Sequence, residues 1–118
     1  MTTVLASFLG NYLRNLGYEV LVATSACQAR EMAGRRSHID LFITDVLLGE
    51  VTGFELAAAL QNQIPGLGVF FLSADPGLIN RHPGLRPGTN FFPKPFAMRE
   101  LAIEIRSALD LSRAVTRP

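Results

Sequence analysis

Three apolar segments of the sequence each end on one polar side chain that could take part in chemistry. DLFIT is followed by Asp45, GVFFL by Ser73, and NFFP by Lys94. If the segments are parallel strands of one sheet, these ends share an edge, and open α/β sheets bind their ligands at that edge. Neighbouring strands lie about 4.8 Å apart, which puts the Cα atoms of Asp45 and Lys94 about 10 Å apart, with Ser73 between them. A lysine side chain covers most of that gap, so we expect Lys94 to be aimed at Asp45 or at a group carried on it.

Lys94 also has an unusual local setting, between Pro93 and Pro95. Each proline fixes one φ angle and removes one backbone hydrogen-bond donor. Prolines within a sheet are confined to edge strands and strand ends. We therefore expect this lysine to be held on a stiff tether at the edge of the strand before it.

The elements that must position these residues alternate along the chain, as in a parallel sheet covered by helices on both faces. Apolar spacings of three and four predict a first helix over residues 4–16, closed by Gly17. Two capping boxes, Ser25 with Gln28 and Thr52 with Glu55, predict the starts of two further helices. The remaining pattern predicts helix ends near 35 and 61, strands over 18–23, 40–45, 68–73 and 89–92, and a last helix over 97–111.

One segment departs from this alternation of strands and helices. The stretch DPGLINRHPGLRPG, residues 75–88, is rich in proline and glycine where a crossover helix is expected. At most one or two helical turns are predicted there. His82, within it, has no second histidine or carboxylate at ligand spacing, so we interpret it as a solvated loop residue.

Length and composition indicate one globular domain over residues 1–118. The chain has a mass of 12.9 kDa and is 48% hydrophobic, and a chain of this size can bury about two-thirds of its unfolded surface. No apolar run approaches the length of a membrane span and no signal peptide is recognisable, which predicts a cytoplasmic protein without membrane contact. The net charge of +1 without a dense basic run argues against nucleic-acid binding. The single cysteine, Cys27, is predicted to be a buried small hydrophobic residue.

Taken together, these motifs resemble the receiver domains of two-component response regulators. The resemblance rests on Asp45 with Gly53 eight positions later, an apolar strand ending in Ser73-Ala74, and Lys94-Pro95-Phe96 twenty-one residues after Ser73. It covers nearly the whole chain, and the stretch LRPGTNFFPKPF is most similar to receivers of hybrid histidine kinases. The resemblance implies an α/β, flavodoxin-like, doubly wound parallel sheet in the order 2-1-3-4-5.

The resemblance also implies roles for individual residues. Asp45 would accept a phosphoryl group from a histidine kinase in a phosphorelay, and Lys94 would supply positive charge to that group. Ser73 would be the hydroxyl switch and Phe91 the aromatic switch, so that phosphorylation changes a protein-interaction surface. Ser73 as an ordinary turn residue and Phe91 as a plain core residue stay open. The Lys94-Pro95 bond is often cis in the family.

The chain departs from the family at its start. Receivers open with an apolar strand ending in two adjacent acidic residues, which hold Mg²⁺ together with the phosphoacceptor. Counting back from Gly17, that pair would fall at or just before Met1. We therefore expect strand 1 to be missing, the domain to be N-terminally truncated or incomplete, and Mg²⁺ to bind weakly if at all, through Asp45 and the backbone carbonyl of Leu47. A homodimer compensating for the missing strand is a further prediction.

Two other functions are alternatives to the interpretation of Asp45 as a phosphoacceptor. A pseudo-receiver would keep the fold and bind a partner independently of phosphorylation. A phosphatase or dehalogenase would use Asp45 as a hydrolytic nucleophile, but the Asp-x-Asp pattern typical of those folds is replaced here by Asp45-Val46-Leu47. We therefore expect a signalling domain rather than an enzyme. The cognate kinase and the output are not encoded in any motif.

Overall fold

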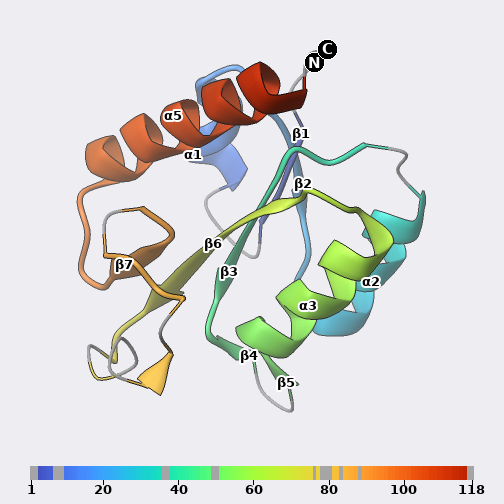
Figure 1. Ribbon diagram of the computed structural model, residues 1–118, viewed down its shortest axis with the longest axis horizontal. Coiled ribbons are helices and arrows are strands. Elements are labelled where there is room, and N and C mark those ends of the chain that lie inside the picture. The colour runs from blue at the N-terminus through green and yellow to red at the C-terminus, as the bar shows by residue number, and fades with distance from the viewer. Residues whose placement is uncertain are drawn as a thin grey trace.

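A five-stranded parallel sheet in the order β2-β1-β3-β6-β7 forms the centre of the computed structural model (Figure 1). The structure describes residues 3–6, 10–35, 38–48, 51–75, 77, 81–82, 84–87 and 89–116. The strands of the sheet are β1 (Thr3–Ala6), β2 (Glu19–Val22), β3 (Leu41–Asp45), β6 (Gly68–Ser73) and β7 (Phe91–Pro93), and β4 (Leu47–Leu48) with β5 (Val51–Thr52) forms a small antiparallel ribbon. The helices are α1 (Gly10–Asn15), α2 (Ala26–Arg35), α3 (Gly53–Gln63) and α5 (Met98–Thr116). This is the α/β flavodoxin-like order that the sequence predicted.

The N-terminus corrects one prediction, because strand 1 is present. Residues 3–6 form the central strand β1, parallel to both β2 and β3, although residues 4–6 were predicted to begin a helix. All four are buried. A short apolar run buried on both faces of a sheet cannot be told from a helix by periodicity alone. The helix that follows is correspondingly short, at six residues.

Polar contacts hold the start of β1 in place. The Thr3 amide donates to Asp40 Oδ2 at 2.7 Å, and the Thr3 hydroxyl donates to Glu19 Oε1 at 2.9 Å. The Thr3 carbonyl in turn accepts from the Asp40 amide at 2.8 Å. With β1 between β2 and β3, the unpaired strand edges that motivated a homodimer do not exist. Dimerisation stays an untested prediction, and the missing strand that motivated it is present in the structure.

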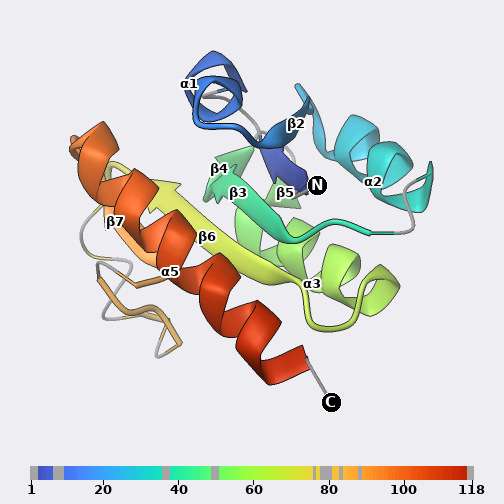
Figure 2. The same cartoon turned by 90° about the horizontal axis from the view of Figure 1, so that it is seen from above.

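Side chains of alternate strand residues form two cores, one on each face of the sheet, and helices cover both faces (Figure 2). Helices α1 and α5 cover one face, where Leu101 and Ile105 of α5 are fully buried against β1, β3 and β6. Helices α2 and α3 cover the other face, where Leu60 of α3 and Phe42 of β3 are buried. The alternation follows from the two-residue period of a strand, which sends successive side chains to opposite faces.

Local signals set the starts of α2 and α3 as the sequence predicted. The Thr52 hydroxyl accepts from the Glu55 amide at 3.1 Å, and the Glu55 carboxylate accepts from the Thr52 amide at 3.4 Å, a complete capping box. At α2 the Ser25 hydroxyl accepts from the Gln28 amide at 3.1 Å. Cys27, in the first turn of α2, is exposed, so its predicted burial was wrong. None of the helices in the described part of the chain has the length and apolar character needed to cross a bilayer.

Candidate functional site

Asp45 and Lys94 form an ion pair at the carboxyl edge of the sheet. Lys94 Nζ lies 2.6 Å from Asp45 Oδ1. The two residues are 49 positions apart along the chain, and only the parallel arrangement of β3, β6 and β7 brings them together. Their side chains are 29% and 38% exposed, so the pair is accessible to a partner molecule yet partly shielded from water. Such shielding strengthens an interaction between charges relative to a fully exposed pair.

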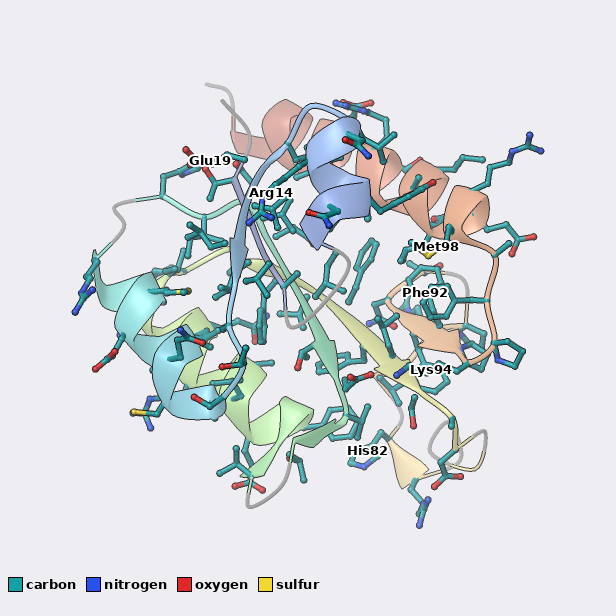
Figure 3. The ribbon with its side chains drawn as sticks, turned by 180° about the vertical axis from the view of Figure 1, so that it is seen from behind. Arg14, Glu19, His82, Phe92, Lys94 and Met98 are labelled. Carbon is teal, nitrogen blue, oxygen red and sulfur yellow. The ribbon has the colours of Figure 1, made fainter. Side chains whose placement is uncertain are left out.

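The backbone directs Lys94 toward this edge. Its amide donates to the Ser73 carbonyl at 2.7 Å, which continues the pairing of β6 with β7 one residue past Pro93. The Lys94-Pro95 peptide bond is cis. Figure 3 shows Lys94 near the ends of β3 and β6, with Glu19 at the opposite edge of the sheet. The backbone of Lys94, which the flanking prolines predicted to be stiff, is therefore hydrogen-bonded to the neighbouring strand β6.

Ser73 lies between the two charged residues, as the strand order requires. It is the last residue of β6 and is 5% exposed. Asp45 is paired in register with Leu72, the residue before it. The Ser73 hydroxyl accepts from the Asp75 amide at 3.0 Å. A hydroxyl that accepts one hydrogen bond can still donate its proton, so Ser73 retains a donor for an acceptor group at this edge.

Phe91 is fully buried in a small cluster next to the site. It packs with Val46, which follows Asp45, and with Leu85 from the segment between β6 and β7. Phe54 and Phe71 pack against this cluster. Phe91 thus packs with residues from both the loop that follows the candidate phosphoacceptor and the segment between β6 and β7.

His82 belongs to the same region and differs from its predicted solvated state. Its ring stacks on Phe54 of α3, with centroids 4.1 Å apart, and it is half-buried. Phe54, His82 and Leu85 line a hollow of about 220 Å³. The prediction for residues 75–88 rested on proline and glycine content, which says nothing about such contacts. Much of that segment, including most of its predicted turns, lies outside the described residues.

A pocket of about 250 Å³ adjoins Asp45 on the α2 side of the sheet. Asp45 and Thr44 line it from β3, and Thr24 and Ser25 line it from the start of α2. Thr44 is fully buried, and its hydroxyl donates to the Asp45 carbonyl at 2.9 Å. Sequence reasoning missed Thr44, because a threonine inside an apolar strand carries no signal beyond ordinary strand propensity.

Gly53 follows Asp45 at the spacing noted in the sequence, and the structure gives the reason for it. A Cβ atom at Gly53 would lie 2.3 Å from the Asp45 carbonyl oxygen and 3.2 Å from Thr44 Cγ2. The Gly53 amide donates to the Val46 carbonyl at 2.6 Å. Helix α3 therefore begins directly against the backbone at the end of β3.

Replacing Gly53 with alanine should lower the free energy of unfolding by about 1–3 kcal/mol, because the clash is with backbone that cannot move away cheaply. Urea unfolding measures the change. Gly34, inside α2, is the matched control: its Cβ would meet only Gln63 Nε2, at 3.9 Å. Alanine at Gly34 should stabilise by about 0.5–1 kcal/mol through helix propensity. Equal effects at both glycines would contradict the close-approach explanation.

The residues at this edge do not fit a magnesium ion. Mg²⁺ requires near-octahedral oxygen ligands, usually with one or two carboxylates among them. Residues 1–18 contain no aspartate or glutamate, and among the described residues no three potential metal-binding side chains lie together. Asp45 is the carboxylate present at the site, and Lys94 contacts it directly. Leu47, whose carbonyl was the second predicted ligand, lies in β4 two residues later.

Comparison with known proteins places this geometry in a family. The model of the response regulator receiver domain matches residues 2–106. The transcriptional regulatory protein CssR of Bacillus subtilis is 33% identical over 108 residues, which are 91% of this chain and 47% of that protein. The sensor protein EvgS of Escherichia coli O157:H7 is 39% identical over 82 residues, which are 70% of this chain and 7% of that protein. The chain thus spans about half the length of the transcriptional regulator.

Solved structures agree with the sequence matches. The non-phosphorylated HemR receiver domain of Leptospira biflexa superimposes with a TM-score of 0.79 at 28% identity, covering 100% of this chain and 98% of that one. The receiver domain of the hybrid histidine kinase CckA gives a TM-score of 0.72 at 26% identity, covering 92% and 99%. Because the relatives include transcriptional regulators, a special likeness to hybrid-kinase receivers stays a prediction. The chain belongs to the family of response regulator receiver domains of two-component signalling.

Proposed function

We propose that this receiver domain accepts a phosphoryl group from a histidine kinase on Asp45 and thereby changes a protein-interaction surface in a cytoplasmic phosphorelay. The observation that carries the proposal is the 2.6 Å contact between Lys94 Nζ and Asp45 Oδ1. It places a fixed positive charge at the only strand-end carboxylate of the motif, where negative charge accumulates during phosphoryl transfer.

The proposed reaction is a direct displacement at phosphorus. An oxygen of the Asp45 carboxylate forms a bond to the phosphorus of a phosphohistidine while the phosphorus–nitrogen bond breaks. The imidazole leaves with that electron pair and takes up a proton. The product is an acyl phosphate. Lys94 offsets the charge of the transferred group, and the Ser73 hydroxyl donates to one of its oxygens.

The switch in this proposal links Ser73 to Phe91. If the Ser73 hydroxyl turns toward a phosphoryl oxygen, it gives up its hydrogen bond from the Asp75 amide, at 3.0 Å in this structure. We expect this to alter the packing around Leu85, which lies between β6 and β7 and packs on Phe91. The two states differ in this local packing, which is the kind of bistable element that a phosphoryl group biases.

Incubation with acetyl phosphate or a phosphorylated histidine kinase, followed by intact-mass spectrometry, tests the proposal. The native chain should gain the mass of one phosphoryl group, and the Asp45→Asn variant should gain none. Asp75→Asn is the matched control, because Asp75 pairs with Arg81 at 2.7 Å in a similar but separate ion pair. It should be phosphorylated like the native chain.

The absence of a carboxylate in residues 1–18 favours the second candidate, a receiver that binds a partner without being phosphorylated. The same experiment distinguishes the two. No mass gain from either donor, with millimolar Mg²⁺ present or absent, would overturn the phosphoacceptor proposal in favour of the binding module. A mass gain that persists in Asp45→Asn would show that another residue is modified.

A further inference from the structure

A groove of about 450 Å³ lies on the face of the sheet opposite the Asp45 pocket, between the end of α1 and the first three turns of α5. Helices α1 and α5 lie on the same face of the sheet (Figures 1 and 2). Leu16 and Tyr18 line it from one wall, and Ala102 and Ile103 line it from the other.

The groove exposes apolar surface. Leu16 is 44% and Ile103 is 56% exposed, and these are the exposed large hydrophobic residues of the described chain. They lie on opposite walls of one depression. Single exposed apolar residues are ordinary on protein surfaces, whereas apolar residues gathered in one depression with a polar rim mark an interaction site.

Positive charge flanks this apolar surface. Arg99, Ile103 and Arg106 are spaced at i, i+4 and i+7, so they form one stripe along α5 with the apolar residue between the two arginines. Both arginines are exposed, and neither makes an ion pair with another described residue. Arg106 lies over the ring of Tyr18, with Cζ 5.2 Å from the centroid. Among the described residues, no aspartate or glutamate lines the groove.

We propose that this α1–α5 groove binds an amphipathic helix of a partner protein, one with an apolar ridge flanked by carboxylates. An amphipathic helix binds to a groove through apolar side chains at i, i+3, i+4 and i+7 of the bound helix, and Leu16, Tyr18 and Ile103 supply apolar walls for such a ridge. Carboxylates beside the ridge would pair with Arg99 and Arg106, neither of which makes an ion pair with another described residue. A second copy fits less well, since a symmetric contact across this groove would bring arginines from both copies together.

The test uses a synthetic amphipathic peptide helix with leucines at i, i+3, i+4 and i+7 and glutamates beside them, titrated into the unphosphorylated full chain. Binding followed by amide chemical-shift changes should map to α1 and the first half of α5. The variant Ile103→Glu should weaken binding at least about 10-fold, and so should Arg99→Glu combined with Arg106→Glu. A peptide with lysines in place of the glutamates should bind at least about 10-fold more weakly.

Arg30→Glu supplies the matched control, since Arg30 is an exposed arginine on α2, on the opposite face of the sheet. It changes the net charge as Arg99→Glu does and should leave binding unchanged. Equal weakening by Arg30→Glu, no loss with Ile103→Glu, or no binding by the native chain would each overturn the proposal. Concentration-dependent self-association abolished by Ile103→Glu would instead assign the groove to a second copy.

This inference is independent of the proposed phosphorylation. Ile103 lies on the face of the sheet away from the Asp45 pocket, so Ile103→Glu should take up a phosphoryl group like the native chain. Failure of peptide binding would therefore leave the phosphoacceptor proposal standing. Failure of phosphorylation would leave the proposal of helix binding in the groove standing.

Discussion

Replacing Lys94 with methionine should lower the rate of Asp45 phosphorylation by at least about 100-fold. Methionine keeps most of the length and apolar volume of the lysine stem but removes the ammonium that lies 2.6 Å from Asp45 Oδ1. Removing one preorganised charge or donor from a reacting centre typically costs about 10²–10³ in rate. The effect should be at the upper end of that range, because no carboxylate cluster in the described chain can hold a compensating metal ion. Phosphoryl uptake followed by mass against time measures it.

Two further variants show whether the phosphorylation rate depends on the positive charge at the site or on positive charge elsewhere in the protein. Arg81→Met removes a cation from the Asp75–Arg81 pair, which has a comparable 2.7 Å contact but lies outside the site, and should leave the rate unchanged. Lys94→Arg keeps the charge with a different shape and should recover only part of the rate. A rate for Lys94→Met within about threefold of native would show that the ion pair is structural, and the proposed role of Lys94 would be lost.

The candidate site at the carboxyl edge of the sheet could be predicted because the sequence pattern that marks it is simple. A parallel sheet places all its carboxyl ends on one edge, so an apolar run that ends on a single polar residue assigns that residue to the edge. Asp45, Ser73 and Lys94 satisfy this rule, and the structure brings them together. The register could be inferred only roughly. The expected Cα separation already put Asp45 nearly within reach of Lys94, and the structure places the ammonium in direct contact with the carboxylate.

The N-terminus was not predictable from the same kind of pattern. Val4 and Leu5 fit the helical spacing with residues further along the chain and also fit a strand buried on both faces. The decision is made by long-range contacts, namely pairing with β2 and β3 and the hydrogen bonds of Thr3 with Asp40 and Glu19. Contacts between residues 37 positions apart leave no trace in local periodicity. Counting back from Gly17 also assumed a first helix of ordinary length.

Side-chain environments in loops and at helix starts were the other weak point. Cys27 was assigned to the core from the general preference of cysteine for burial, yet its place in the first turn of α2 leaves it exposed. His82 was assigned to solvent from its proline-rich surroundings, yet Phe54 on α3 provides an aromatic face for it. For His82 the deciding factor is a neighbour that is distant in sequence, and for Cys27 it is the side of α2 on which the residue lies.

Replacing Phe91 with alanine should lower the free energy of unfolding by about 3–5 kcal/mol, the usual cost of removing a buried phenylalanine ring. Phe91 has no exposed surface, and it joins Val46 to Leu85, so no adjacent solvent can fill the space at low cost. Domains are stable by only about 5–15 kcal/mol, so this variant should be close to unfolding at 37 °C. Urea denaturation measures the loss, and Ile103→Ala, at an exposed position, should change stability by less than about 0.5 kcal/mol.

The variant Phe91→Leu distinguishes two roles of Phe91, that of a core residue alone and that of a switch that transmits phosphorylation. Leucine retains much of the buried apolar volume, so the variant should lose only about 1–2 kcal/mol and take up a phosphoryl group at the native rate. If Phe91 transmits the signal, phosphorylation of the native chain should alter hydrogen exchange at the Leu85 amide, which donates to the His82 carbonyl at 3.1 Å. The altered exchange should be absent in Phe91→Leu. An identical response in both proteins would make Phe91 a core residue alone, because a switch that works equally well without its ring is not operated by that ring.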